Sequence, residues 1–193
     1  IPVEDVIPMD NGIKKIYTGK IVEITKHPDA DKLQVCQVEC LTEEGEPVTK
    51  QIVTAATNVA VGQIVPVAYH KSRLADGTEI KKGKLRGVAS EGMFCSVAEF
   101  GISSDLVLPE EAQGIYIFPE NTPIGLDVKD VLGMNDTVYE FELTANRADC
   151  FSMVGLSREF GMMTNQKALF PVIMVNENGE SIEGKASVSI EAD

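Results

Sequence analysis

The segment KLRGVASEGMFCS, Lys84 to Ser96, concentrates side chains that could contact a nucleic acid. Its two cations can pair with phosphate oxygens, its hydroxyl groups can hydrogen-bond to a sugar or a base, and its methionine offers a polarisable surface on which a nucleotide can rest. The candidate contacts in this segment are Lys84, Arg86, Ser90, Met93 and Ser96. A glycine-rich basic segment is equally compatible with a solvated hairpin, so its chemistry alone leaves both interpretations open.

The distribution of charge decides whether such a chain can bind phosphate at all. The net charge of −13 at pH 7 argues against a nucleic-acid partner, because an acidic protein repels phosphate. Residues 1–90 hold 12 basic and 12 acidic side chains, whereas residues 91–193 hold 5 and 18. A local basic patch therefore survives on the acidic chain, and it consists of Lys71, Arg73, Lys81, Lys82, Lys84 and Arg86.

Alternating β-branched and apolar residues predict the elements that must position these side chains. Strands are expected over Ile16–Thr25, Leu33–Leu41, Lys50–Ala56 and Ile64–His70, and a fifth begins near Lys84 and alternates as far as Ser90. Turn-forming sequences, among them Asp76-Gly77, separate them. The pattern predicts a mainly β protein with some α-helix, built on a small, closed or nearly closed five-stranded barrel.

Three segments resemble, in order and spacing, the tRNA-binding domain that is attached to several aminoacyl-tRNA synthetases and also occurs as a free protein. They are HPDADKL from His27, IVTAATNV from Ile52, and the segment from Lys84. The resemblance implies an oligonucleotide-binding (OB) barrel that meets RNA on its outer face, with Lys32 and Asn58 added to the contacts named above. Glu91 inside the third segment and the lack of a strongly basic tail depart from the family, so we expect weak binding by this module alone.

A second resemblance covers most of the remaining chain. ELTANRADCFSMVGLSREF, from Glu142, is similar to the region that follows the inserted barrel in bacterial phenylalanyl-tRNA synthetase beta subunits. The resemblance implies an OB-fold domain over residues 13–120, inserted in a small α/β domain made of residues 1–12 and 121–185. Residues 186–193 would begin a further, truncated domain.

Two local expectations accompany this division. The resemblance implies that Val3–Pro8 forms a strand that pairs near Tyr139–Leu143. The sequence pattern from Thr137 to Gln166 predicts a strand and then a helix, with Asp149 as its N-cap and Asn165 near its C-terminal end.

The function implied by the resemblance is that of an accessory part of a larger enzyme. The parent would charge tRNA with phenylalanine in the cytoplasm, using ATP and magnesium, as a heterotetramer of two alpha and two beta subunits. The first residue, Ile1, fits a piece of a longer chain. Two alternatives stay open: a structural or protein-contact scaffold with little RNA affinity, and a free-standing tRNA-binding protein, which the second resemblance disfavours.

Enzyme chemistry has no candidate site in this sequence. Neither a G-x-S-x-G elbow nor a phosphate-binding loop occurs, and the surplus of carboxylates singles out no acid and base pair. The cysteines, at 36, 40, 95 and 150, show no C-x-x-C spacing, so we expect neither a metal site nor disulfides. No apolar run approaches the roughly 20 residues that cross a membrane, and we expect tRNA rather than DNA or a membrane as partner.

Overall fold

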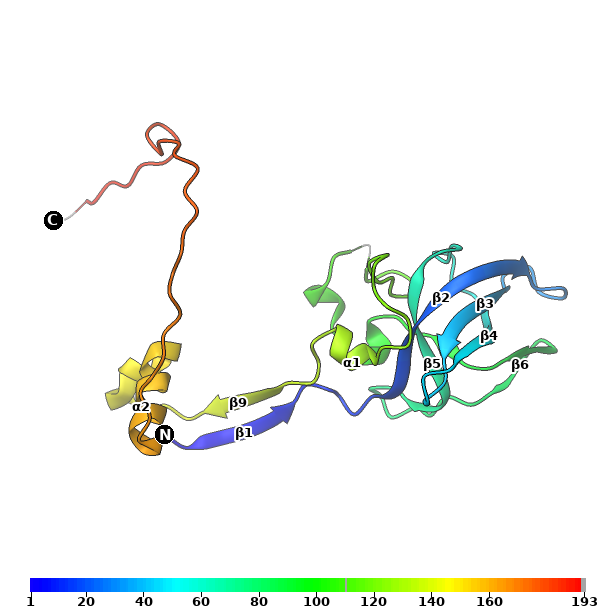
Figure 1. Cartoon of the computed structure of the whole chain (residues 1–193), viewed down its shortest axis with the longest axis horizontal. Helices are drawn as coiled ribbons and strands as arrows, with labels where there is room; N and C mark the ends of the chain where they lie inside the picture. The colour runs from blue at the N-terminus through cyan, green and yellow to red at the C-terminus, as the bar shows by residue number, and fades with distance from the viewer. Residues whose placement is uncertain (110, 192–193) are drawn as a thin grey trace. The chain divides into compact units, whose positions relative to one another are not determined.

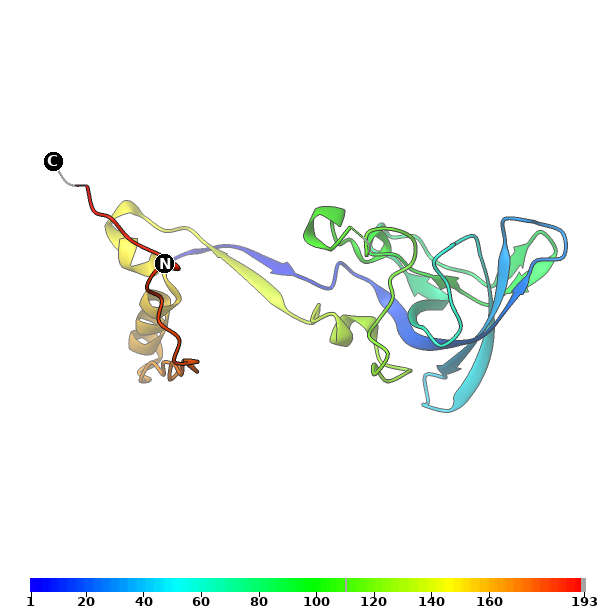
Figure 2. The same cartoon turned by 90° about the horizontal axis from the view of Figure 1, so that it is seen from above.

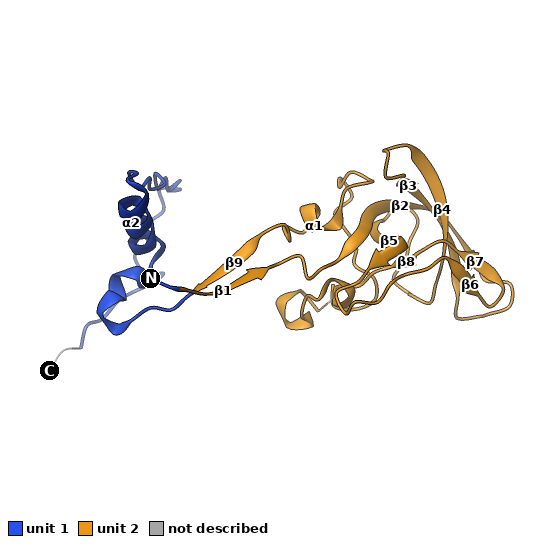
Figure 3. Ribbon diagram, turned by 90° about the horizontal axis from the view of Figure 1, so that it is seen from below, with its two compact units in different colours: residues 1–2, 141–193 blue, residues 3–140 orange. Residues whose placement is uncertain are grey.

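The computed structural model describes residues 1–109 and 111–191, so the last two residues of the expected domain at 186–193 lie outside the described part. The chain forms two compact units, which are coloured separately in Figure 3. The larger unit comprises Val3–Glu140, and the smaller unit comprises Ile1–Pro2 together with Phe141–Asp193.

A five-stranded antiparallel sheet forms the centre of the larger unit (Figure 1). Its strands are β2 (Lys14–Lys26), β3 (Gln34–Leu41), β4 (Pro47–Thr54), β5 (Ile64–Arg73) and β8 (Met93–Phe94). They lie side by side in the order β4-β3-β2-β5-β8. The prediction of a mainly β chain with a five-stranded, OB-like sheet is confirmed.

The barrel is open between β4 and β8, which are the two ends of the sheet. The strand pairs among the described residues include none between the backbones of β4 and β8. The five strands therefore do not form a closed barrel. The residues just before β8 bridge the opening instead. The amide of Glu91 donates to the carbonyl of Gln51 in β4 at 2.8 Å.

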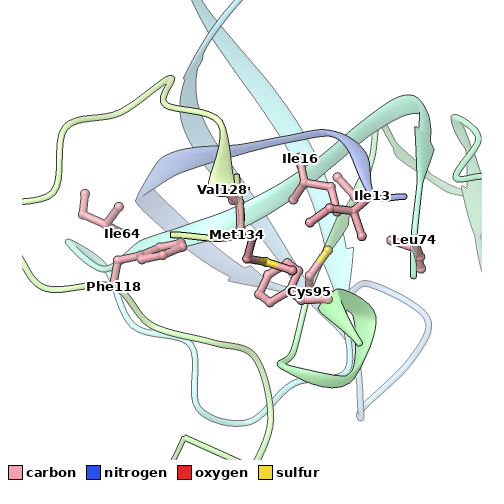
Figure 4. Close-up of a cluster of buried hydrophobic side chains, with 10 residues drawn as sticks. Ile13, Ile16, Ile64, Leu74, Cys95, Phe118, Val128 and Met134 are labelled. Carbon is pink, nitrogen blue, oxygen red and sulfur yellow. The ribbon is translucent and has the colours of Figure 1, made fainter. Parts of the chain in front are cut away.

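Two clusters of buried side chains fill the interior. Figure 4 shows the first, which gathers residues from β2 and β5 with others from later in the chain, among them Cys95, Phe118 and Val128. The second lies between β2, β3, β4 and β5 and contains Cys36 and Cys40. Burial raises the pKa of the Cys36 thiol to about 11 and that of Cys95 still further, so these thiols behave as small apolar groups.

The segment after β8 covers the first cluster. It contains the 3₁₀ helices η1 (Ala98–Phe100) and η2 (Ser104–Leu106) and the short helix α1 (Val128–Val131). Between η2 and α1 the chain returns to the sheet: the amide of Tyr116 donates to the carbonyl of Cys95 and that of Phe118 to the carbonyl of Ile64, both at 2.9 Å.

A separate two-stranded sheet carries the chain into and out of the larger unit. Strands β1 (Val3–Pro8) and β9 (Thr137–Phe141) pair and run in opposite directions (Figures 1 and 2). The amide of Met9 extends the pairing by donating to the carbonyl of Asp136 at 3.0 Å. The predicted pairing of these two segments is confirmed.

The smaller unit contains the 3₁₀ helix η3 (Ala145–Phe151) and the helix α2 (Met153–Thr164). Asn165 ends α2 as predicted, with a left-handed φ of 52°. The predicted N-cap is wrong: Ser152 caps α2 by accepting from the amide of Gly155 at 3.0 Å, while the carboxylate of Asp149 pairs with Arg147. No helix in the described part of the chain has the length and apolar character that a bilayer crossing requires.

Candidate nucleic-acid interface

The candidate segment that begins at Lys84 folds as a hairpin rather than as the single strand that its alternation predicts. Strands β6 (Gly83–Leu85) and β7 (Val88–Ser90) pair antiparallel, with Arg86 and Gly87 between them. Both turn residues have positive φ, 48° and 89°, which is the backbone of the tight two-residue turn that joins twisted strands. The side chains of Lys84 and Arg86 are exposed on this hairpin.

Ser90 fixes the base of the hairpin to the sheet. Its buried hydroxyl accepts from the amide of Val53 in β4 at 3.0 Å and donates to the carbonyl of Gly92 at 2.9 Å. The side-chain amide of Gln51 adds a bond to the carbonyl of Ala89 at 2.7 Å. The hydroxyl that the sequence suggests for RNA contact is therefore engaged within the protein.

An ion pair holds the beginning of the hairpin to its end. Lys82 Nζ lies 2.8 Å from a carboxylate oxygen of Glu91, the acidic residue that departs from the family pattern. The hydrogen bond from Lys82 is the main cause that holds the pKa of Glu91 below its usual value. Glu91 is thus a neighbour of this lysine within the protein, and its negative charge is compensated there.

The loop between β2 and β3 contacts the hairpin through His27, which is 5% exposed. Its Nδ1 accepts from the amide of Asp29 at 3.1 Å, and its Nε2 lies 3.0 Å from the carbonyl of Leu85 in β6. Because Nδ1 accepts a bond, Nε2 carries the proton and donates to Leu85. One neutral imidazole therefore joins the loop that carries Lys32 to the hairpin that carries Lys84 and Arg86.

Lys32 lies at the rim of a pocket of about 580 Å³ between this loop and the end of β4. Lys26 supplies a second cation, and Asp31 is the acidic member of the lining. The complete lining is Lys26, Asp31, Lys32, Leu33, Gln34, Ala55 and Thr57. With amide, hydroxyl and ammonium groups around it, this pocket can accept the sugar and phosphate of a nucleotide.

The remaining candidate contacts serve the fold in this structure. The side chain of Asn58 donates to the carbonyl of Ile115 at 2.8 Å and accepts from its amide at 3.1 Å. The Ser96 hydroxyl bonds to the carboxylate of Glu99, and Met93 is half-buried against the first core cluster. The structure thus places Lys32, Lys84 and Arg86 on joined, exposed segments, and direct RNA contact stays a prediction for all seven candidate residues.

Within the described residues, no group of three or more His, Cys, Asp or Glu side chains could hold a metal ion. The site consists of cations, amides and hydroxyls around the β6–β7 hairpin, which hydrogen bonds hold to the neighbouring segments. Its chemistry is that of binding.

Residues 16–126 match the protein family described as "Putative tRNA binding domain". This chain belongs to that tRNA-binding family. The matched region contains the five-stranded sheet almost entirely, the hairpin, and the His27 loop.

Curated relatives extend the similarity beyond the tRNA-binding family region. Three are named phenylalanine--tRNA ligase beta subunit. The protein from Clostridium acetobutylicum is 47% identical over 165 residues, covering 86% of this chain and 20% of that protein. Those from Moorella thermoacetica and Geobacillus kaustophilus are 44% and 42% identical and cover 98% and 100% of this chain. The chain spans about one fifth of the length of these relatives.

The sequence did not predict the roles of two residues that hold the hairpin in place. His27 and Gln51 hold the hairpin from two sides, yet an isolated histidine and a strand glutamine give no signal of that role. Their partners lie 58 and 38 residues away in the sequence. Only the folded chain brings them together.

Replacing Ser90 by Ala should lower the free energy of unfolding by about 1–3 kcal/mol, because it leaves a buried amide and a buried carbonyl without a partner. Urea denaturation followed by tyrosine fluorescence measures this, since the four tyrosines, at 17, 69, 116 and 139, all lie in the larger unit. Ser96→Ala is the matched control, with a smaller loss because its partly exposed partners can bind water. Unchanged stability with weaker tRNA binding would instead assign the Ser90 hydroxyl to RNA.

Proposed function

We propose that this chain is the accessory tRNA-binding part of a phenylalanine--tRNA ligase beta subunit. The observation that carries the proposal is the exposed, cationic hairpin on a fold of the tRNA-binding family, in a chain whose relatives bear that ligase's name. Lys84 and Arg86 pair with phosphate oxygens of the tRNA, and Lys32 adds a third cation from the adjoining loop. Asn58, Ser90, Met93 and Ser96 complete the proposed contact region and shape its support.

The acidic composition does not prevent this binding. At physiological ionic strength the Debye length is about 8 Å, so the phosphates respond chiefly to the charges nearest to them. The hairpin and its flanks carry the basic patch, whereas the acidic surplus lies after residue 90. The local field at the hairpin is therefore positive on a chain with a net charge of −13.

The complete enzyme supplies what this chain lacks. In the proposal, ATP and magnesium serve the activation of phenylalanine elsewhere in the ligase, and the alpha subunit joins the beta subunit in a heterotetramer of two copies each. The enzyme acts in the cytoplasm. The chain described here contributes tRNA binding without a catalytic site of its own.

A scaffold function is the second candidate. The net charge and the internal use of the hydroxyls of Ser90 and Ser96 favour it, because both reduce what the surface can offer to RNA. In that case the five-stranded sheet would serve as a spacer or protein contact surface within the synthetase. A free-standing tRNA-binding protein is disfavoured because the similarity to the ligase subunits extends over nearly the whole chain.

Titration of labelled tRNA with this protein, followed by fluorescence anisotropy, separates these functions. If the interface neutralises about four phosphates, the binding constant should fall roughly 50- to 150-fold between 50 and 200 mM salt. Duplex DNA of similar length is the control and should bind more weakly. Absence of saturable binding at the lowest salt, with the fold verified by circular dichroism, would favour the scaffold.

A further inference from the structure

A second cationic hollow lies near the C-terminal end of β3, whereas Lys32 lies before its N-terminal end. Its volume is about 360 Å³, and it is bounded by the turn that joins β3 to β4 and by strands β2, β4 and β5. Its lining is Lys15, Thr42, Glu43, Glu44, Lys50, Tyr69, His70, Lys71 and Lys82. Four lysines from separate segments thus converge on one hollow in an acidic chain.

Two of these lysines already pair with carboxylates, and a phosphate could replace one of these carboxylates. Lys15 Nζ lies 2.6 Å from Glu43 and Lys82 Nζ lies 2.8 Å from Glu91. The side chain of Glu43 is 52% exposed, and an exposed ion pair of this kind contributes little stability. Its carboxylate therefore marks a position that an anion favours and can leave at small cost.

The other two lysines have no carboxylate partner among the ion pairs of the described residues. Lys50 extends over the ring of Tyr69, with Nζ 4.4 Å from the ring centroid. The Tyr69 hydroxyl donates to the carbonyl of Leu41 at 2.8 Å, which fixes the ring as a rigid support. Lys71 is exposed beside it.

Lys15 and Lys71, which both line this hollow, have an unfavourable backbone conformation. Their φ angles are 58° and 63°, a left-handed conformation that lysine rarely adopts. The pairing of β2 with β5 shifts register between Lys14 and Ile16, so a bulge lies at Lys15. Bulges commonly turn a side chain toward a functional site, and strained residues persist where the surrounding structure enforces them.

We propose that this hollow binds a phosphate of the same RNA chain that the hairpin holds, with Lys50 and Lys71 as its main contacts. The inference rests on the proposed tRNA-binding function and extends the interface. The eight residues of β3 separate the Lys32 loop from the Glu43 turn, a span of about 23 Å along the strand. An RNA backbone that follows the β3 and β4 edge can therefore engage both clusters, while Glu43 gives up Lys15 to the phosphate.

The test compares three double variants with the wild-type chain in tRNA anisotropy titrations at several salt concentrations. Lys50→Gln/Lys71→Asn removes the two cations, and Asn is chosen because it tolerates the left-handed backbone. Lys20→Gln/Lys129→Gln removes the same charge from other parts of the larger unit. Lys84→Gln/Arg86→Asn removes the hairpin cations, and unfolding curves verify that every variant is folded.

Support for the second site is a loss of about 0.7–0.9 in the slope of log affinity against log salt for Lys50→Gln/Lys71→Asn, because one phosphate contact disappears. The control variant should keep the wild-type slope. If the hairpin variant loses affinity while Lys50→Gln/Lys71→Asn matches the control, the second site is refuted and the proposed function stands. If the wild-type chain itself binds no tRNA, the proposed function fails, and the second site fails with it.

Discussion

Replacing Lys84 by Gln and Arg86 by Asn should weaken tRNA binding about 25- to 60-fold at roughly 100 mM salt, because each lost phosphate contact removes about 0.7–0.9 from the salt slope. Both side chains are exposed on the hairpin, so the change removes charge without opening the core. The fall in affinity between about 50 and 200 mM salt should shrink to roughly 7- to 12-fold if two of about four contacts remain.

Asn at position 86 removes the charge of Arg86 but keeps the turn, so the variant tests binding without disturbing the fold. The Arg86-Gly87 turn has positive φ at both residues, and Asn-Gly is the sequence that such turns prefer. The variant should therefore unfold at the same urea concentration as the wild-type chain, or at a slightly higher one. Lys20→Gln/Lys129→Gln controls for the loss of two charges. Equal affinities of the two variants would contradict the hairpin's role and favour a scaffold.

Replacing Gly92 by Ala should lower the free energy of unfolding of the larger unit by about 1–3 kcal/mol or more, because the added methyl group has no room. A Cβ at this position would lie 2.3 Å from the carbonyl oxygen of Ala68 and 3.3 Å from a methyl group of Ile52. The oxygen belongs to the backbone of β5, inside the sheet, so it cannot rotate away as a side chain would. Tyrosine fluorescence during urea denaturation reports this loss.

Gly83→Ala is the matched control for this substitution. Gly83 begins β6, has no left-handed φ, and its nearest neighbour to a new Cβ is the Lys81 carbonyl at 4.0 Å. Its unfolding free energy should stay within about 0.5 kcal/mol of the wild-type value, as for an exposed site without special contacts. Similar stabilities of the two variants would mean that β8 does not lie this close to β5 in solution.

The strands of this fold could be predicted from sequence because their alternation is local. β2, β3, β4 and β5 begin and end within a few residues of the predicted ranges. The β6–β7 hairpin could not be predicted in this way, because the alternating pattern of its residues continues through the turn without interruption. Arg86 in a left-handed conformation leaves no signature in the sequence, and only Gly87 hints at a reversal.

The roles of polar side chains were the least predictable part of the site. A hydroxyl such as that of Ser90 has the same chemistry for an RNA sugar as for a buried amide, and its partner Val53 lies 37 residues away. Asp149 and Ser152 are both good helix caps, but α2 begins at Met153, so Ser152 holds the cap position while Asp149 lies within η3 and pairs with Arg147. Exposed cations need no such partner, and Lys84 and Arg86 are exposed, so their contact with RNA stays a prediction.

The bond between His27 and Leu85 has a consequence for the thermodynamics of recognition. A free hairpin would have to give up its motion relative to the neighbouring loop when RNA arrives, and that ordering entropy would be subtracted from the affinity. Here the imidazole has already fixed the two segments relative to each other in the unbound chain. The backbones that carry the cations on both sides therefore meet the RNA already joined, and the ordering that remains is mainly that of the cationic side chains themselves.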